Sequence, residues 1–185
     1  MKKESWAAPG VCGPMLAHFT RASKQASAFD NLVSILHDGV LRAGSRMVRS
    51  QRPVICFFDA TLEELARTVT RRNRRRYEPF GVAVDRRYAF RHGARPVIYL
   101  PADEARQLLP RDELWRAVAL QLDRDPPIDW CFEREWRLPG DLPLENRHAV
   151  ALVETWRDSE AIYDYFNGTP PCAGVIPLRD VFAYA

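Results

Sequence analysis

Two glutamates separated by a single residue stand in the stretch IDWCFEREWRLPGD, residues 128–141. If this stretch is extended, side chains alternate between two faces, so Glu133, Glu135 and Arg137 share one face. Paired carboxylates on one face can carry acid–base or electrostatic catalysis on a bound substrate. The alternative is a surface strand in which neighbouring arginines form ion pairs with both glutamates, each worth about 0–1 kcal/mol.

A run of arginines, RRNRRR, gives the first half of the chain its basic character. The net charge is +3 overall, with +7 in residues 1–80 and −4 in the remainder. Arginines in such a run can neutralise nucleic-acid phosphates, and Tyr77 or Phe80 can stack on a base. The alternative is a solvated connection after a helix. The predicted nucleic-acid-binding residues are Arg71, Arg72, Arg74, Arg75 and Arg76.

The composition is that of an ordinary globular protein, with 46% hydrophobic and 28% charged residues in a chain of 185. We expect one domain over residues 1–185, because this length supports one good core and is short for two. The sequence has no run of about 18 apolar residues and no signal-peptide pattern, so we expect a cytoplasmic protein that does not engage a membrane. The cysteines are scattered without CxxC pairs, so no metal is expected, and Cys56 and Cys131 are predicted to pack as small apolar residues.

Hydrophobic spacing predicts the elements that position these residues in the first half of the chain. The clearest is a helix in SAFDNLVSILHDG, where apolar residues recur with helical spacing and Gly39 ends the helix. A second helix, in ATLEELARTVT, can be capped by Asp59 or Thr61. The segment DRRYAFRHG is predicted to form a helical turn. Strands are predicted for the segments LAHFT, PVICFFD and FGVAV.

In the second half, the segment PRDELWRAVALQLDRDPP is predicted to be a helix that ends at Pro126, with Leu114, Val118 and Leu122 along one side. The segment DSEAIYDYFNG is predicted to be another helix, closed by Gly168. Further strands are predicted in PVIYL, residues 128–141, HAVALVETW and AGVIPL. This mixture predicts the α+β class, as a single domain with a mixed or antiparallel sheet core and flanking helices.

Several segments, taken in this order, resemble an uncharacterised bacterial family described as AbiGi-like and linked to abortive phage resistance. The resemblance implies a role in phage defence or in a toxin–antitoxin system, with a toxin or antitoxin as the cognate partner. It covers about residues 15–140 and is carried by LAHFTRA, NLVSILHDGVL, VICFFD, YEPFGVAV, RPVIYL and IDWCFEREWR.

The segments HFT and NLVSILHDGVL are similar, more distantly, to the opening of DarT-like ADP-ribosyltransferases, where a strand bearing His-x-Thr precedes a helix. In that family the strand holds NAD, which is a substrate, and a glutamate on a later strand acts at the ribose beside nicotinamide. The resemblance implies an ADP-ribosyltransferase-like fold in which His18, Thr20 and Asn31 bind NAD. It also implies that Glu135 is the catalytic glutamate and that Glu133 is an accessory one, as in the Glu-x-Glu pattern of other ADP-ribosyltransferases.

The implied chemistry is physically reasonable for this set of residues. Breaking the nicotinamide–ribose bond builds positive charge on the sugar, and a carboxylate bonded to the 2-hydroxyl group interacts more strongly as that charge develops. A second carboxylate two residues away can orient an acceptor. Residues 15–20 and 130–138 are therefore predicted to be strands that converge on one pocket. Arg52, at the entrance of a predicted strand, is a candidate for binding the NAD diphosphate, and Tyr77 and Tyr99 are candidates for stacking on nicotinamide.

Each of these residues also has a purely structural interpretation. His18 beside Phe19 can be a buried histidine whose hydrogen bonds are satisfied within the protein. Trp130 and Trp136 can belong to the core, since large aromatic side chains contribute most to cores. Arg52 can point into solvent.

Three functional classes remain open. The first is an ADP-ribosyltransferase-like enzyme or NAD glycohydrolase, acting on nucleic acid or protein in phage defence or a toxin system. The second is a non-enzymatic antitoxin or nucleic-acid-binding partner with a degenerate form of the fold. The third is a metal-dependent nuclease, whose carboxylates would come from Asp59, Asp85, Glu133 and Glu135. The sequence lacks GxGxxG, GxxxxGK[ST], HExxH and GxSxG, which disfavours dinucleotide oxidoreductases, P-loop NTPases, zincins and α/β-hydrolases.

Overall fold

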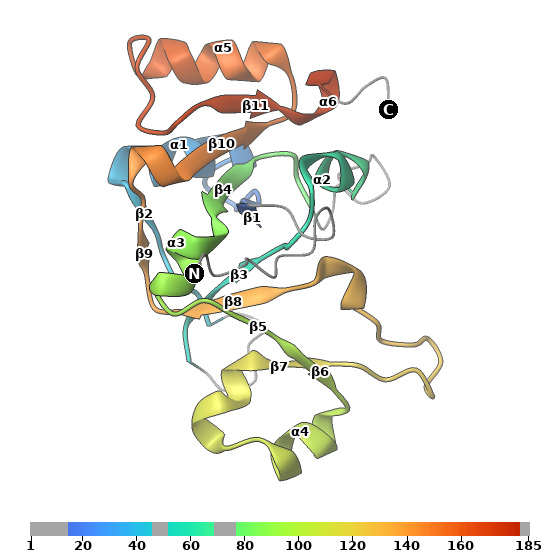
Figure 1. The fold of residues 1–185 in the computed structure, drawn as a ribbon. Helices are drawn as coiled ribbons and strands as arrows, with labels where there is room; N and C mark the ends of the chain where they lie inside the picture. Colours follow the sequence, from blue (N-terminus) through green and yellow to red (C-terminus); the bar gives the residue numbers. More distant parts are fainter. Residues whose placement is uncertain (1–14, 46–51, 69–76, 182–185) are drawn as a thin grey trace, which may run out of the picture.

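A four-stranded sheet forms the central layer of the protein. The computed structural model describes residues 15–45, 52–68 and 77–181 (Figure 1). In sheet order, the strands are β1 (Met15–Phe19), β4 (Gly81–Asp85), β10 (Ala149–Val153) and β11 (Val175–Pro177). Strands β1 and β10 both run antiparallel to β4, and β11 runs parallel to β10.

A three-stranded antiparallel sheet crosses below the first and meets it at β1 (Figure 1). The junction is a bridge in which Ala17 and Phe58 exchange two backbone hydrogen bonds of 2.9 and 2.8 Å. The strands of this second sheet are β3 (Val54–Phe57), β8 (Trp136–Pro139) and β5 (Arg95–Pro96). Two short pairs complete the strands: β2 (Val40–Leu41) with β9 (Leu142–Pro143), and β6 (Ile98–Leu100) with β7 (Ala117–Ala119).

Capping motifs define the two longest helices, α1 (Ala28–Asp38) and α5 (Trp156–Tyr165). Ser27 and Asp30 form a reciprocal capping box at the start of α1, and Thr155 and Asp158 do the same for α5. Helix α1 ends at Gly39, whose φ of 65° is the left-handed conformation that glycine adopts without strain. The predicted boundary at Gly39 is therefore confirmed.

The remaining helices are short and lie around the edges of the sheets. Thr61 caps α2, as predicted, because its hydroxyl accepts the backbone N–H of Glu64. The short α-helices are α2 (Leu62–Thr68), α3 (Arg86–Arg91), α4 (Ala102–Leu108) and α6 (Leu178–Val181), and the 3-10 helices are η1 (Arg111–Arg116), η2 (Cys131–Glu133) and η3 (Asn146–His148). No helix within the described ranges is long and apolar enough to span a membrane.

Alternate side chains of β1 enter two hydrophobic clusters. Leu16 packs in the larger cluster with Leu32 and Leu36 of α1, whereas Ala17 packs in the smaller one with Phe58 and other residues near α2. Burial of these side chains is the main stabilising term of the fold. The predicted α+β class, with a mixed sheet core and flanking helices, is confirmed.

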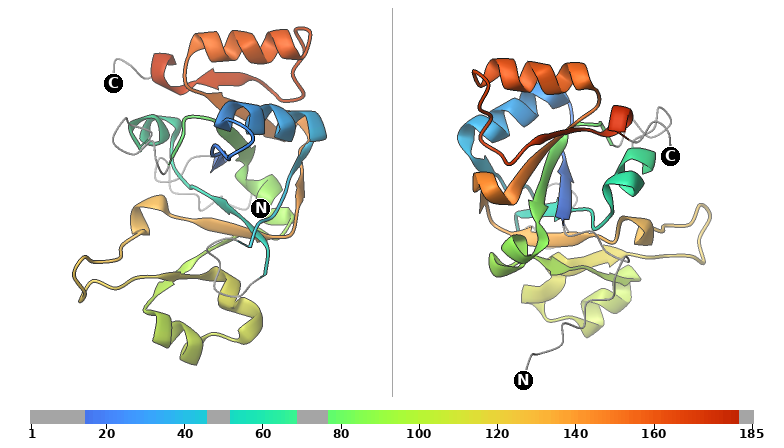
Figure 2. Two further views of the ribbon diagram at one scale, coloured as in Figure 1. Left: turned by 180° about the vertical axis from the view of Figure 1, so that it is seen from behind. Right: turned by 45° about the horizontal axis from the view of Figure 1, so that its top comes forward.

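The helix predicted over residues 110–127 is wrong. The chain forms η1 and then enters β7, where Val118 pairs with Tyr99 of β6. Val118 is buried, but Leu122, predicted on the same helical face, is 65% exposed on a connection that projects from the body (Figure 2). Pairing with β6 provides hydrogen-bond partners for the backbone N–H and C=O groups of β7. This pairing outweighs the weak helical preference of the sequence.

The strand predicted to run unbroken from residue 128 is also wrong. Cys131–Glu133 is a 3-10 turn, Arg134 is left-handed at φ 43°, and the strand begins only at Trp136. Asp129 starts the turn by accepting the N–H of Cys131 at 2.9 Å. Arg134 then donates to the Asp59 carbonyl and to the Glu64 carboxylate, both at 2.6 Å, which holds its unusual backbone conformation.

Candidate active site

A cavity of about 370 Å³ lies where β1 and β3 face the turn that leads into β8. On the β7 side, the wall consists of small apolar residues, and aromatic side chains also line the cavity. Charged and polar groups also line the cavity, among them Glu133, Glu135 and Arg137. The lining residues are His18, Phe19, Arg21, Cys56, Phe57, Phe58, Tyr77, Ala117, Val118, Ala119, Trp130, Glu133, Glu135 and Arg137.

His18 projects from β1 into this cavity with a defined tautomer. Its Nδ1 atom lies 2.9 Å from the carbonyl oxygen of Cys56. Because a carbonyl oxygen only accepts, Nδ1 must carry the hydrogen, and Nε2 of the neutral ring is left as an acceptor. Burial lowers the pKa of His18 below its ordinary value, so the ring is neutral at neutral pH.

Gly81 allows β4 to approach the backbone of His18 closely. A Cβ atom at residue 81 would lie 2.2 Å from the carbonyl oxygen of His18, well inside van der Waals contact. Glycine is therefore required here by the close approach of two strands. The glycine of the FGVAV segment thus allows β4 to pack closely against β1 and helps to fix the position of His18.

Glu135 is held by a buried bidentate ion pair with Arg137. The Nε–Oε1 and Nη2–Oε2 distances are 2.7 and 3.3 Å, and each residue is only 6% exposed. Arg137 also donates through Nη1 to the carbonyl oxygens of Trp115 at 2.8 Å and Ala117 at 3.3 Å. Burial acts to lower the pKa of Arg137, but its hydrogen bonds and charge interaction with Glu135 raise it overall.

This ion pair differs from the exposed surface pair considered as the alternative for the motif. Its members are buried in the cavity wall, and the guanidinium group links β8 to η1 and β7. Removing one member of such a pair leaves a buried charge without compensation, which typically costs about 3–5 kcal/mol. The orientation of the Glu135 carboxylate is thus strongly constrained.

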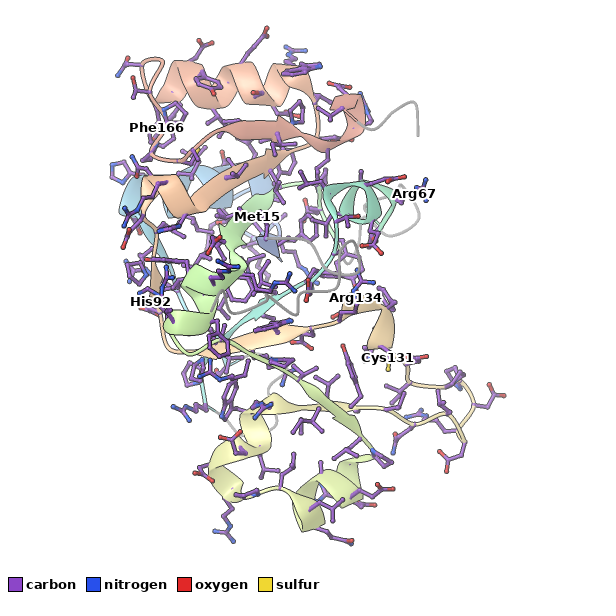
Figure 3. The ribbon with its side chains drawn as sticks, viewed as in Figure 1. Met15, Arg67, His92, Cys131, Arg134 and Phe166 are labelled. Atoms are coloured by element: carbon purple, nitrogen blue, oxygen red, sulfur yellow. The ribbon has the colours of Figure 1, made fainter. Side chains whose placement is uncertain are left out.

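Glu133 lines the same cavity from the 3-10 turn. It is 8% exposed, and Oε1 accepts a very short hydrogen bond from the hydroxyl of Tyr77, itself buried. Tyr99 lies behind the neighbouring glutamate and accepts the backbone N–H of Glu135 at 2.9 Å. Cys131 and Arg134 bracket the turn before the start of β8 (Figure 3). The two glutamates therefore face one cavity although they do not belong to one strand.

Cys56 contributes a thiol to the cavity wall. It stands opposite Arg137 in the β3–β8 register, and its surface is exposed to the cavity that it lines, so the prediction that it packs as a small apolar residue is wrong. Because the cavity is recessed, protein atoms around the thiol still exclude much of the solvent, and this desolvation, with the nearby charge of Glu135, raises its pKa to about 12. The thiol is therefore protonated at neutral pH and is a poor nucleophile.

Thr20 and Asn31 lie beside a second cavity of about 290 Å³, which also includes His18 in its wall. The Thr20 hydroxyl lies 2.8 Å from the Ala28 carbonyl oxygen, and Asn31 donates to the Arg21 carbonyl at 2.7 Å. Both side chains thereby fix the connection from β1 to α1. Ser34, Asp38 and Arg42 add further polar groups to this cavity.

Arg52 lies apart from both cavities. It is exposed, and its guanidinium carbon is 5.8 Å from the centre of the Trp115 ring. The arginines predicted to bind nucleic acid, Arg71, Arg72, Arg74, Arg75 and Arg76, fall outside the described residues. The structure thus brings together His18, Glu133 and Glu135, places Thr20 and Asn31 next to them, and leaves Arg52 outside.

Trp130 and Trp136 are both partly buried; Trp136 packs against the larger hydrophobic cluster, in line with the core position considered for it, whereas, within the described residues, Trp130 belongs to neither cluster. Trp130 lines the cavity, and the indole N–H of Trp136 donates to the Asp59 carboxylate at 3.1 Å. Among the polar lining residues, the sequence interpretation missed Arg21 and Cys56. Arg21 follows HFT directly, and Cys56 lies between inward-facing residues of a strand, so the strand pattern offered a signal for both.

A metal site has no support in the described part of the chain. Within residues 15–45, 52–68 and 77–181, no group of three or more His, Cys, Asp or Glu side chains is arranged to hold a metal ion. The nuclease hypothesis requires such a group. Two of its candidates have other partners: Asp85 caps α3, and Asp59 binds Arg86 and Trp136.

Comparisons with known proteins give a single structural likeness to report. No family model matches the chain, and no curated protein sequence matches it. Among solved structures, Thermus sp. 2.9 DarT in complex with NAD+ is similar, with a TM-score of 0.47 and 12% sequence identity over 89% of this chain and 96% of that chain. A score of this size leaves the DarT-like and AbiGi-like resemblances as predictions.

Proposed function

We propose that this protein is an ADP-ribosyltransferase-like enzyme that uses NAD as its substrate and cleaves the nicotinamide–ribose bond in the cavity beside β1. The observation that supports this most strongly is the placement of Glu135 and Glu133, both buried, in one cavity with a neutral His18. In the reaction, the bond from ribose C1 to the nicotinamide nitrogen breaks, and nicotinamide leaves with the electron pair. The acceptor then bonds to C1 and releases a proton.

Glu135 is proposed to stabilise the ribosyl cation as it forms. Arg137 engages both of its oxygens, but each carboxylate oxygen has a further lone pair that can accept a ribose hydroxyl. Because the arginine is also bonded to two carbonyls, the carboxylate is oriented before substrate arrives. Preorganised charge of this kind is usually the largest catalytic contribution.

His18 is proposed to bind NAD through its neutral ring. The nicotinamide of NAD carries a positive charge before cleavage, so a protonated histidine beside it would repel the substrate. A neutral His18, with Nε2 as an acceptor, avoids that repulsion and can bond a hydroxyl or amide group. The aromatic rings of Tyr77 and Trp130 in the same cavity favour a flat cationic ring.

The rest of NAD is proposed to extend toward the second cavity. His18 belongs to the walls of both cavities, and Thr20 and Asn31 line the second. Since Arg52 lies outside both, Arg21 is the better placed cation for the diphosphate. Glu133 is assigned to the acceptor, which is nucleic acid or protein. On the AbiGi-like resemblance, we place the activity in phage defence or a toxin–antitoxin system.

The test is nicotinamide release from NAD by the wild type and by Glu135→Gln. The amide keeps the shape of the side chain and an acceptor for Arg137, so we expect similar NAD affinity but a loss of turnover of about 100-fold or more. Because the variant leaves the charge of Arg137 unpaired, its melting temperature is measured alongside and turnover is compared where both proteins are folded. Glu133→Gln is the matched variant and should reduce transfer to an acceptor more than release of nicotinamide. A wild type that neither binds nor consumes NAD would refute the enzyme proposal.

A second candidate is a non-enzymatic partner protein, such as an antitoxin, with a degenerate form of the site. The observation in its favour is the Glu135–Arg137 pair, which neutralises the carboxylate that catalysis would use. In this case the arginine run 71–76 would bind nucleic acid through phosphates. Binding would then weaken steeply with salt, and replacing Arg74, Arg75 and Arg76 by Ala would flatten that dependence.

A further inference from the structure

Asp59 contacts the catalytic turn on both sides of Glu135. Its backbone N–H donates to the Glu133 carbonyl at 3.3 Å, and its own carbonyl accepts from Arg134 Nε at 2.6 Å. Its side-chain Oδ2 accepts the indole N–H of Trp136 at 3.1 Å. One residue thus contacts three positions of the turn, which together flank Glu135.

Asp59 is itself fixed to the rest of the fold. It lies two residues after the end of β3, is 3% exposed, and its Oδ2 accepts a hydrogen bond of 3.2 Å from Arg86 at the start of α3. The carboxylate therefore links the turn to the end of β4 as well as to β3. The position of the turn at Arg134, which is not paired in a sheet, is therefore set by its contacts with Asp59, which is itself fixed by the two sheets.

The second oxygen of this carboxylate points to a role beyond stability. Oδ1 of Asp59 is buried and, among residues 15–45, 52–68 and 77–181, has no hydrogen-bond partner. Buried polar atoms without partners are rare and destabilise a protein, so a carboxylate kept in this position calls for an explanation, and one recognised explanation is a functional role. An apolar residue would avoid this cost but would not bind Trp136 and Arg86 together.

We propose that Asp59 is a positioning residue that holds Glu135 and Glu133 in their catalytic directions; this inference rests on the proposed NAD-cleaving function. The left-handed backbone of Arg134 sets the direction in which the chain leaves η2, and it persists only while neighbouring groups hold it. Trp136 fixes the chain on the other side of Glu135. Without the Asp59 side chain, the indole loses its acceptor and the turn gains freedom. A displacement of about 1 Å in a catalytic group can cost about 100-fold in rate.

The experiment combines amide hydrogen exchange with NAD turnover in three variants. Asp59→Ala removes both side-chain contacts, Asp59→Asn keeps an acceptor for Trp136 but removes the charge facing Arg86, and Trp136→Phe removes only the indole donor. Asp158→Ala is the control, since Asp158 caps α5 far along the chain from this turn. All four proteins are compared with the wild type at equal distance below their melting temperatures.

We expect Asp59→Ala to accelerate exchange across residues 131–137 by about 10-fold or more, with β1, β4 and β10 unchanged. Turnover should fall about 10- to 100-fold while KM changes by less than about 3-fold. Asp59→Asn and Trp136→Phe should change exchange and turnover in the same direction but by less. These two variants test the proposal if Asp59→Ala does not fold. The double variant Asp59→Ala/Glu135→Gln should be no slower than Glu135→Gln alone, because both changes act through Glu135.

Unchanged exchange at 131–137 in the Asp59 and Trp136 variants would overturn the proposal, as would multiplicative losses of turnover in the double variant. A different result is possible: the Asp59 variants exchange faster at 131–137, but the wild type itself releases no nicotinamide. That result would refute the proposed function and leave Asp59 as the residue that holds the turn. Faster exchange in Asp158→Ala at the same residues would show general loosening and also refute a specific role.

Discussion

The two sides of the candidate active site are built in different ways. One side consists of β1 and β3, whose positions follow from backbone hydrogen bonds with β4, β8 and each other. The other side combines β7, which in the described part of the chain pairs only with the short β6, with the turn before β8, and a few side chains that bond to backbone carbonyls hold these parts together. Arg137 reaches two carbonyls there, and Arg134 reaches a third.

This difference predicts where mutations have their effect. A strand ladder tolerates most side-chain replacements because its bonds are made by the main chain. A turn held by guanidinium groups loses several bonds when one arginine is replaced. The irregular side should therefore be the more sensitive of the two, and it carries both glutamates.

The largest effect is expected for Arg137→Ala on the irregular side. The variant leaves Glu135 buried without its partner and removes the donor to Trp115 and Ala117. We expect the free energy of unfolding to fall by about 3–5 kcal/mol, measured by urea denaturation. The double variant Glu135→Gln/Arg137→Ala should recover part of the loss, because the buried charge is gone. A loss below about 1 kcal/mol would mean that the pair is hydrated like a surface pair.

A smaller effect is expected for Gly81→Ala on the regular side. The new methyl group would meet the carbonyl of His18, so β1 and β4 must separate locally, at a cost of about 1–3 kcal/mol. Gly44→Ala is the matched control, because a Cβ atom there would meet none of the described residues within 4 Å. Thermal melts of both variants test the difference. Equal melting temperatures would show that the strands approach each other less closely than described.

The next prediction concerns pH and also tests the regular side. Burial lowers the pKa of His18, so the unfolded chain takes up a proton at a higher pH than the folded protein does. Stability is therefore present above the unfolded pKa of about 6.5 and is lost as pH falls toward the folded pKa. We expect the melting temperature of His18→Gln to fall less between about pH 7 and pH 5 than that of the wild type. The exposed His37, replaced by Gln, is the control and should follow the wild type.

The smallest effect is expected for Glu64→Gln, which weakens one contact of Arg134. The hydrogen bond from Arg134 lowers the pKa of Glu64, but both side chains are partly exposed. Solvent screens such pairs, so the free energy of unfolding should change by less than about 1 kcal/mol. Urea denaturation at neutral pH measures this change. A larger loss would mean that the salt bridge, rather than the Asp59 carbonyl, maintains the left-handed turn.

Sequence patterns predicted the regular side well because its signals are local. The helix ending at Gly39 and the strand before Asp59 follow from spacing, capping residues and β-branched content. The irregular side depends on contacts between distant residues, such as Arg134 with Asp59 and Val118 with Tyr99, which no local pattern encodes. The alternation in FEREWR nevertheless indicated that both glutamates face one side, although the strand it implied is a turn and a shorter strand.

The meeting of the two sheets at Ala17 and Phe58 has a consequence for ligand binding. The cavity lies along this seam, and His18 adds a hydrogen bond across it to Cys56. A molecule that fills the cavity would contact both sheets and oppose their separation. Its binding would raise the melting temperature with concentration, since a ligand bound only to the folded state stabilises it by about 1.4 kcal/mol for each tenfold excess over Kd. Because the cavity lies where the two sheets meet, a bound ligand would stabilise the contact between the sheets against unfolding.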